Sequence, residues 1–151
     1  MQTTSFVPSF VLQPGHAGNV QREHRAAERM LPCRPSTVAE VRRLVRELAG
    51  RWKRASEIAE VACLVISEMA TNSVLHSGSP GMTVRLTLHE RHLRAEVVDT
   101  GTWKASADPA VDGMADHGRG LFLIEALSMS SGCHHDPHGT RSWACISTVG
   151  A

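Results

Sequence analysis

The sequence predicts a single α+β domain, built as a two-layer α/β sandwich with helices packed on one face of a sheet. Two segments with helical periodicity follow one another, and two segments with strict alternation come directly after them. Helices that are grouped, rather than alternating singly with strands, are typical of α+β architecture. The chain has 151 residues, of which 42% are hydrophobic, so it is long enough for one core and too short for two ordinary domains.

The N-terminal residues 1–24 contain scattered prolines and glycines without sustained periodicity, which is typical of a flexible leader. We therefore expect one folded domain over residues 25–151. A first strand is expected at Ala26–Leu31, and Pro32 and Pro35 would end it.

Two helices are expected next. Thr37 and Glu40 have the spacing of a capping box, which predicts that a helix begins there. Apolar residues then recur on one side of it, namely Val38, Val41, Val45 and Leu48. Gly50 stands where a left-handed C-terminal cap is expected, and a second helix would begin near Ser56 and end at about His76.

The remaining elements follow from alternation and from turn residues. Residues 82–89 and 93–98 alternate apolar and polar side chains around a short connection, which predicts an antiparallel hairpin. The segment from Thr102 to His117 lacks apolar periodicity and is expected to be a long functional loop. A short helix over residues 121–127 and a final strand at Arg141–Val149 complete the order.

Charge and composition exclude several classes of function. Sixteen basic residues against fifteen acidic residues leave a formal charge of +1, which argues against direct nucleic-acid binding. No apolar run approaches the length of a membrane span, so we expect a cytoplasmic protein without membrane contact. The four cysteines are scattered, which favours reduced and mostly buried thiols, although a disulfide pair stays open.

Three polar residues interrupt the apolar stripe of the second helix. Glu68, Asn72 and His76 are spaced four residues apart, so their side chains lie on one side of the helix and could converge on one ligand. The alternative is that the helix turns its stripe onto Met69 and Leu75 and leaves the polar groups in solvent.

Two glycine-containing segments could add to such a site. Asp99 and Gly101 end a strand, where a carboxylate can accept a hydrogen bond and a glycine lets a ligand approach, although a plain turn has the same pattern. Gly118, Arg119 and Gly120 lead into the next helix, and their flexible backbone with free N–H groups is suited to phosphate binding.

Together, in this order and spacing, these segments resemble the GHKL ATPase family. Its N-box, G1-box and G2-box correspond to Glu68–His76, Asp99–Trp103 and Gly118–Leu121. The resemblance is closer to the short anti-sigma-factor serine/threonine kinases of actinobacteria, extends to Gly139–Trp143, and covers Ala26–Thr148. It implies a Bergerat-type sandwich with a mixed, mostly antiparallel sheet.

The resemblance also implies roles for individual residues in binding ATP and Mg²⁺. Asn72 would be the metal ligand, Glu68 the catalytic base for an incoming hydroxyl, and Asp99 the acceptor for the adenine amino group, with support from the Thr140 hydroxyl. The other residues assigned to nucleotide contact are His76, Gly101, Gly118, Arg119, Gly120 and Leu121.

The function implied is an ATP- and Mg²⁺-dependent serine/threonine protein kinase that phosphorylates an anti-anti-sigma antagonist and alternately holds a sigma factor. Whether the chain is a monomer or a homodimer stays open. Two departures from the family pattern bear on the expected phosphoryl transfer. Trp103 replaces a glycine found in many members, and the expected loop has no lysine beyond Lys104. A nucleotide-gated binding regulator without phosphotransfer is therefore the alternative.

A metal-binding regulator is a third reading, because Cys133–His138 is rich in sulfur and nitrogen ligands. The segment lacks a second ligand cluster that would close a tetrahedral site. Its Asp136-Pro137 step and the following Gly139 instead favour a hairpin connection between the last helix and the last strand.

Overall fold

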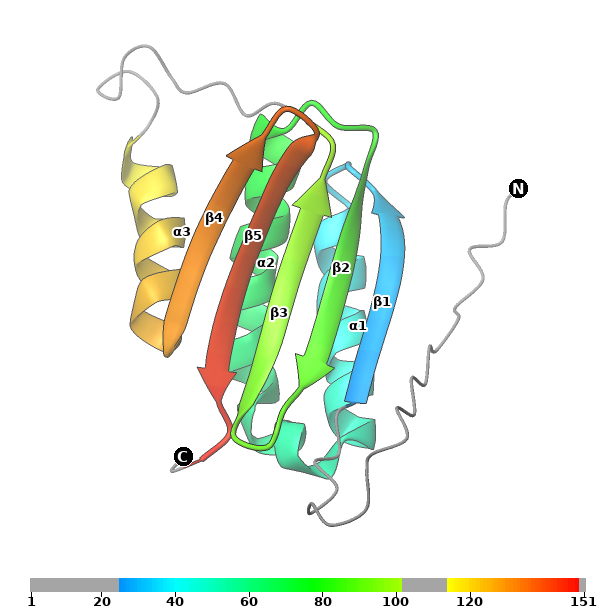
Figure 1. The fold of residues 1–151 in the computed structure, drawn as a ribbon, viewed down its shortest axis with the longest axis vertical. Helices are drawn as coiled ribbons and strands as arrows, with labels where there is room; N and C mark the ends of the chain where they lie inside the picture. Colours follow the sequence, from blue (N-terminus) through cyan, green and yellow to red (C-terminus); the bar gives the residue numbers. More distant parts are fainter. Residues whose placement is uncertain (1–24, 102–113, 150–151) are drawn as a thin grey trace.

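The computed structural model describes residues 25–101 and 114–149 (Figure 1). The expected leader and most of the expected loop after Gly101 lie outside these residues. The elements are β1 (Arg25–Pro32), α1 (Thr37–Arg51), the 3₁₀ helix η1 (Lys53–Ile58), α2 (Ala59–His76), β2 (Gly81–Leu88), β3 (His92–Asp99), α3 (Met114–Leu127), β4 (Ser130–Asp136) and β5 (Gly139–Ser147).

The five strands form one sheet in the order β1-β2-β3-β5-β4, and the helices cover one of its faces (Figure 1). The α+β two-layer architecture is thereby confirmed. All four pairings between the described strands are antiparallel, so the expectation of a mixed sheet was wrong. The reason is that β4 and β5 form a hairpin through Pro137 and His138, whereas a parallel pair would need a long crossover.

The first helix begins where expected but not by the expected cap. Thr37 is the first residue of α1, Ser36 precedes it without a side-chain cap, and the Thr37 hydroxyl donates to the carbonyl oxygen of Pro32. Glu40 instead lies 3.9 Å from Arg34 in an ion pair. The capping box was therefore a wrong prediction, because the hydroxyl ties the helix start to the end of β1.

The junction between the two long helices also differs from expectation. Gly50 lies inside α1 and has no positive φ, and the helix ends when the N–H of the buried Trp52 donates to the carbonyl oxygen of Leu48 at 2.9 Å. The 3₁₀ turn follows, so α2 begins at Ala59, three residues after Ser56. The burial of Trp52 therefore determines where α1 ends, and the preference of Gly50 for a helix C-terminus does not.

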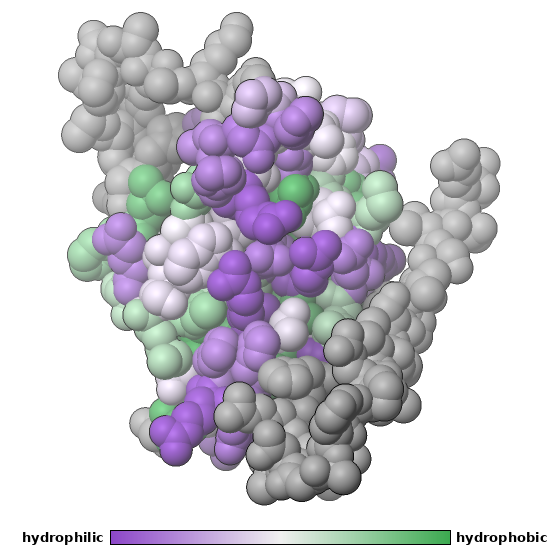
Figure 2. Space-filling view, viewed as in Figure 1, coloured by the Kyte–Doolittle hydropathy of each residue, from purple (hydrophilic) through white to green (hydrophobic). Residues whose placement is uncertain are grey.

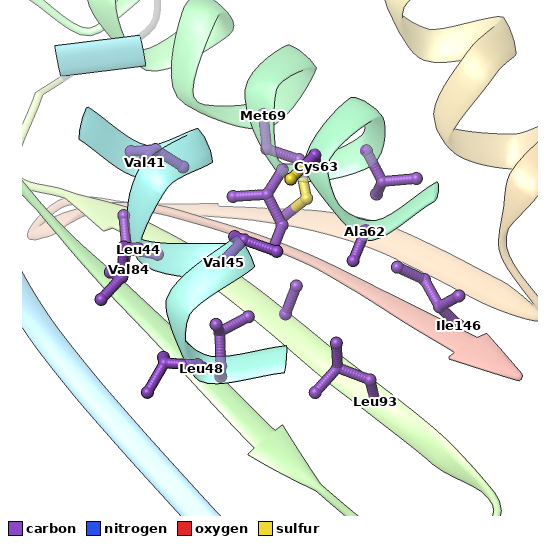
Figure 3. Close-up of a cluster of buried hydrophobic side chains, with 14 of the residues drawn as sticks. Val41, Leu44, Val45, Leu48, Ala62, Cys63, Met69, Val84, Leu93 and Ile146 are labelled. Atoms are coloured by element: carbon purple, nitrogen blue, oxygen red, sulfur yellow. The ribbon is translucent and has the colours of Figure 1, made fainter. Parts of the chain in front are cut away.

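The hydrophobic core lies between the helices and the sheet, as Figure 3 shows for residues from both layers. The alternation predicted for β2 and β3 is confirmed, because their apolar residues face this core. Those buried core residues are Met82, Val84, Leu86, Leu88, Leu93, Ala95 and Val97. Val41, Val45 and Leu48 of α1 are buried as expected, whereas Val38 is only half-buried.

Two expectations about the C-terminal third were wrong. The segment Cys133–His138, expected to be a connection, instead forms most of β4 and the turn after it, and the mostly exposed residues of this strand carry no apolar alternation. Strand β4 is an edge strand, in which Gly132 leaves room for the Trp143 ring of β5, since a Cβ there would lie 2.7 Å from that ring. Helix α3 begins at Met114, so Gly118–Gly120 lie within the helix and not in a turn before it.

The face of the sheet opposite the helices is polar, and Figure 2 shows hydrophilic side chains running across it. A row of charges joins three strands: Arg85 pairs with Glu28 at 2.7 Å and with Glu96 at 3.1 Å, and Arg94 pairs with Glu96 at 2.9 Å. The Arg94 guanidinium also lies 4.8 Å from the ring centroid of Trp143. Among the described helices, none is long and apolar enough to cross a membrane.

Candidate functional site

The polar residues of α2 lie at the boundary between the core and the surface. Glu68, Asn72 and His76 are all half-buried, whereas Met69 is only 1% exposed and Leu75 is 63% exposed. The alternative in which α2 turns both Met69 and Leu75 to the core was therefore wrong for Leu75. The side of α2 that carries Met69 is buried against the core. Glu68, Asn72 and His76 lie along the edge of that buried side, partly open to solvent.

Helix α3 packs beside α2 and meets it at Glu68. A Cβ added to Gly120 would lie 2.8 Å from Oε2 of Glu68, so the backbone of α3 approaches this carboxylate closely. Gly120 is buried and is needed here for close packing between two helices. This differs from the expected turn around phosphates. The surroundings of Gly118 and the side chain of Arg119 lie outside the described part of the chain, and Leu121 is largely exposed.

A buried carboxylate lies where β3 ends. Asp99 is 2% exposed; Ser73 of α2 donates to its Oδ2 at 2.8 Å, and the N–H of Gly101 donates to its Oδ1 at 3.1 Å. The second contact is a local turn of the type that an Asp-x-Gly sequence favours. The first contact is tertiary. Each carboxylate oxygen of Asp99 therefore accepts a hydrogen bond from the chain itself.

Backbone segments pass very close to one another around Asp99, which explains why glycine is required at two positions there. A Cβ at Gly101 would lie 1.7 Å from the carbonyl oxygen of Ser77, and a Cβ at Gly139 would lie 2.0 Å from that of Asp99. The loop after α2 is joined to the same place, because the N–H of Thr100 donates to the Ser79 hydroxyl at 3.2 Å. The end of α2 is thus tied to the end of β3.

Thr140 completes this corner of the sheet. It is 2% exposed and directly opposite Asp99 in the β3–β5 register. Its hydroxyl lies 2.9 Å from Nδ1 of His135, its neighbour on β4, and the Cys133 sulfur lies 3.4 Å from Nε2 of the same ring.

These contacts do not make a metal site. Within the described residues, no group of three or more His, Cys, Asp or Glu side chains could hold a metal ion. All four cysteines are free thiols, as expected, but only Cys63 and Cys145 are buried.

The structure thus brings the expected site residues together as two groups joined by α2. Asp99, Gly101 and Thr140 meet at one corner, and Glu68 meets Gly120 further along the helix. Asn72 lies between them, next to Ser73 in the chain. Sequence reasoning missed Ser73, and the available signal was a serine inside a helix, four residues after the buried Met69.

Comparisons with known proteins agree with this fold. The model of the family described as histidine kinase-like ATPase domain matches residues 31–146. A solved structure containing the RsbU and RsbW domains of Rv1364c from Mycobacterium tuberculosis is similar, with a TM-score of 0.63 and 22% identity over 81% of this chain. The match spans 32% of that longer chain.

A histidine kinase domain from the Erythrobacter litoralis EL346 blue-light activated histidine kinase matches with a TM-score of 0.45 and 17% identity, over 86% of this chain and 70% of that one. No curated protein matches the chain.

Proposed function

The chain belongs to the histidine kinase-like ATPase domain family, and from that premise we propose that it is a cytoplasmic ATP- and Mg²⁺-dependent serine/threonine kinase acting as an anti-sigma regulatory factor. Its substrate would be a serine or threonine of an antagonist protein, and a sigma factor would be its alternate partner. The observation that carries the nucleotide part is the buried Asp99 carboxylate, held by Ser73 and Gly101.

Asp99 suits adenine in particular. A carboxylate is only an acceptor, so it can accept from the exocyclic amino group of adenine, whereas guanine presents a carbonyl oxygen at that position. The two donors from the chain hold the carboxylate in one orientation before a ligand arrives, which reduces the ordering cost of binding. Thr140, directly across the sheet, would add its hydroxyl to the same contact.

The phosphate end of the site would lie along α2 beside α3. Asn72 offers a neutral amide oxygen of the kind that Mg²⁺ accepts, and Glu68, one turn away, offers a carboxylate that can take the proton of an incoming hydroxyl. Mg²⁺, when bound, would neutralise charge on the phosphates of ATP. The half-burial of both side chains leaves them accessible to a ligand.

A nucleotide-gated regulator without phosphotransfer is the second candidate, and the contact between Glu68 and α3 favours it. Because Gly120 approaches Oε2 of Glu68 so closely, an acceptor hydroxyl coming from that side would have to displace α3. If α3 does not move, the domain would hold nucleotide and a partner without transferring a phosphoryl group.

Calorimetry with ATP and GTP, with and without Mg²⁺, tests the nucleotide assignment. We expect a preference for ATP, tighter binding with Mg²⁺, and a loss of more than tenfold in ATP affinity for Asp99→Asn, since a hydrogen bond to a charged group contributes about 1.5–3 kcal/mol. Asp136→Asn is the matched control, because that carboxylate accepts N–H groups in the β4–β5 turn. Equal affinity for GTP, or an Asp99→Asn variant that binds ATP normally, would contradict the assignment.

A further inference from the structure

His135 joins the edge of the sheet to the corner where Asp99 lies. It is exposed on β4, opposite Thr140 in the β4–β5 register, and its Nδ1 lies 2.9 Å from the Thr140 hydroxyl oxygen. Thr140 is itself opposite Asp99 in the β3–β5 register. The three residues therefore form a row across three neighbouring strands, and His135 is the member whose ring nitrogens can act either as donors or as acceptors.

The protonation of His135 determines which way the Thr140 hydroxyl can donate. In the imidazolium form both ring nitrogens are donors, so Nδ1–H donates to the Thr140 oxygen and the hydroxyl hydrogen is available to another acceptor. In the neutral ring Nδ1 can be the acceptor, and the Thr140 hydroxyl can then donate to it. Deprotonation thus allows His135 to take this donor away from the site.

Among the described residues, groups that face His135 come from β4, β5 and β3. Cys133 lies on the same face of β4, and partial burial raises the pKa of its thiol, so it stays uncharged at neutral and mildly acidic pH. From β5 the facing residues are Thr140 and Ser142, which do not titrate there. From β3 the charged group is Asp99, beyond Thr140. The α3 side chains over residues 114–119 lie outside the described part of the chain.

We propose that His135 is a positioning residue that orients the Thr140 hydroxyl for adenine recognition, so that its protonation strengthens nucleotide binding. The inference rests on the proposed function, because it needs Asp99 and Thr140 to contact the base. In adenine a ring-nitrogen acceptor lies beside the exocyclic amino group. The amino group would donate to Asp99 while the Thr140 hydroxyl, released by the imidazolium, donates to the ring nitrogen.

The test measures ATP affinity between pH 5.5 and 8.0 for the wild type, His135→Asn and His134→Asn. His134 is the matched control, because it lies next in the chain, faces the other side of β4 and is 3.9 Å from Asp136. Phosphates of ATP themselves titrate at about pH 6, so the measured quantity is the affinity ratio of wild type to variant at each pH. We expect the ratio for His135→Asn to fall about threefold to tenfold as the pH rises, and the ratio for His134→Asn to stay constant.

Two further variants separate positioning from a structural role. Thr140→Val lacks the hydroxyl, so adding His135→Asn to it should leave the pH profile unchanged. If thermal unfolding shows that the His135→Asn variant is not folded, His135→Gln is used in its place. A ratio for the His135 variant that stays constant with pH overturns this inference alone, provided that ATP still binds in an Asp99-dependent way. A wild type that binds no ATP at any pH overturns the proposed function together with it.

Discussion

Ser73, in the C-terminal half of α2, donates a hydrogen bond of 2.8 Å to Oδ2 of Asp99 at the end of β3, and both residues are almost completely buried. The contact joins the helix that carries Glu68 and Asn72 to the strand end that would contact the base. A hydroxyl in this position does two things. It offsets the cost of burying the carboxylate, and it keeps Asp99 in one orientation.

We therefore expect Ser73→Ala to be destabilising and to weaken ATP binding. Loss of the donor to a buried carboxylate should lower the free energy of unfolding by about 1–3 kcal/mol, measured by urea denaturation. Thr71→Ala is the control on the same helix, because the Thr71 hydroxyl donates to the Ser67 carbonyl oxygen of that helix at 2.7 Å and not to a carboxylate. If the Ser73→Ala protein is no less stable than the Thr71→Ala protein, the hydrogen bond from Ser73 to Asp99 does not contribute to stability.

The two glycines Gly101 and Gly50 should respond to alanine in opposite ways. At Gly101 a Cβ would lie 1.7 Å from the Ser77 carbonyl oxygen, so the backbone must shift, and we expect a loss of about 1–3 kcal/mol or more. At Gly50, inside α1, nothing lies within 4 Å, so alanine should stabilise the helix by about 0.5–1 kcal/mol. Thermal unfolding of both variants measures the difference, and a tolerated Gly101→Ala would refute the close approach to Ser77.

The polar face of the sheet predicts a pH-dependent contribution to stability. Burial alone would raise the pKa of Glu96, but hydrogen bonds and charges from Arg94 and then Arg85 outweigh burial and hold that pKa below its ordinary value. A carboxyl with a lowered folded-state pKa stabilises the fold above its unfolded-state pKa, and the stabilisation is lost as the pH falls through the folded-state value.

Glu96→Gln should accordingly reduce the free energy of unfolding by about 1–3 kcal/mol at pH 7. The difference from the wild type should shrink below about pH 4.5 as Glu96 itself becomes protonated. Urea denaturation at several pH values measures it. Glu47→Gln, in an exposed pair with Arg51, should cost under about 0.5 kcal/mol at every pH. A Glu96→Gln effect that does not change with pH would count against the ion-pair row.

Elements with one buried face could be predicted from the sequence. The alternation in β2 and β3 is strict because one side of each strand meets the core, and the four-residue spacing in α2 put Glu68 and Asn72 on one side by geometry alone. Strand β4 could not be found in this way, because an edge strand without a buried apolar face has no alternation to detect.

The contacts that organise the site are tertiary, which is why the sequence did not reveal them. Nothing local indicates that Ser73 reaches Asp99, or that His135 lies beside Thr140, since each pair depends on how separate elements pack or pair. The same holds for Gly120. Its glycine pattern predicted a turn, whereas packing of α3 against Glu68 places it inside a helix.

The last prediction separates kinase from binder, and it depends on the different tasks proposed for two residues on one side of α2. If Glu68 is the base for an incoming hydroxyl, Glu68→Gln should keep ATP affinity nearly intact while phosphoryl transfer falls by roughly 10²–10⁴-fold. Asn72→Ala should lose both, because removal of a metal ligand weakens Mg²⁺ in the ground state and in the transition state.

The measurement is radiolabel transfer from ATP to a partner that co-purifies from the native host, alongside calorimetry on each variant. Thr71→Ala serves again as the control, because Thr71 lies on the same helix between the two residues and bonds to its own helix backbone. If the wild type binds ATP and its partner but never labels it, the nucleotide-gated regulator replaces the kinase. Transfer that survives Glu68→Gln at the wild-type rate would instead leave a kinase whose base is another group. In both of these cases Asn72→Ala should still weaken ATP binding, because a Mg²⁺ ligand is needed whether or not the phosphoryl group moves.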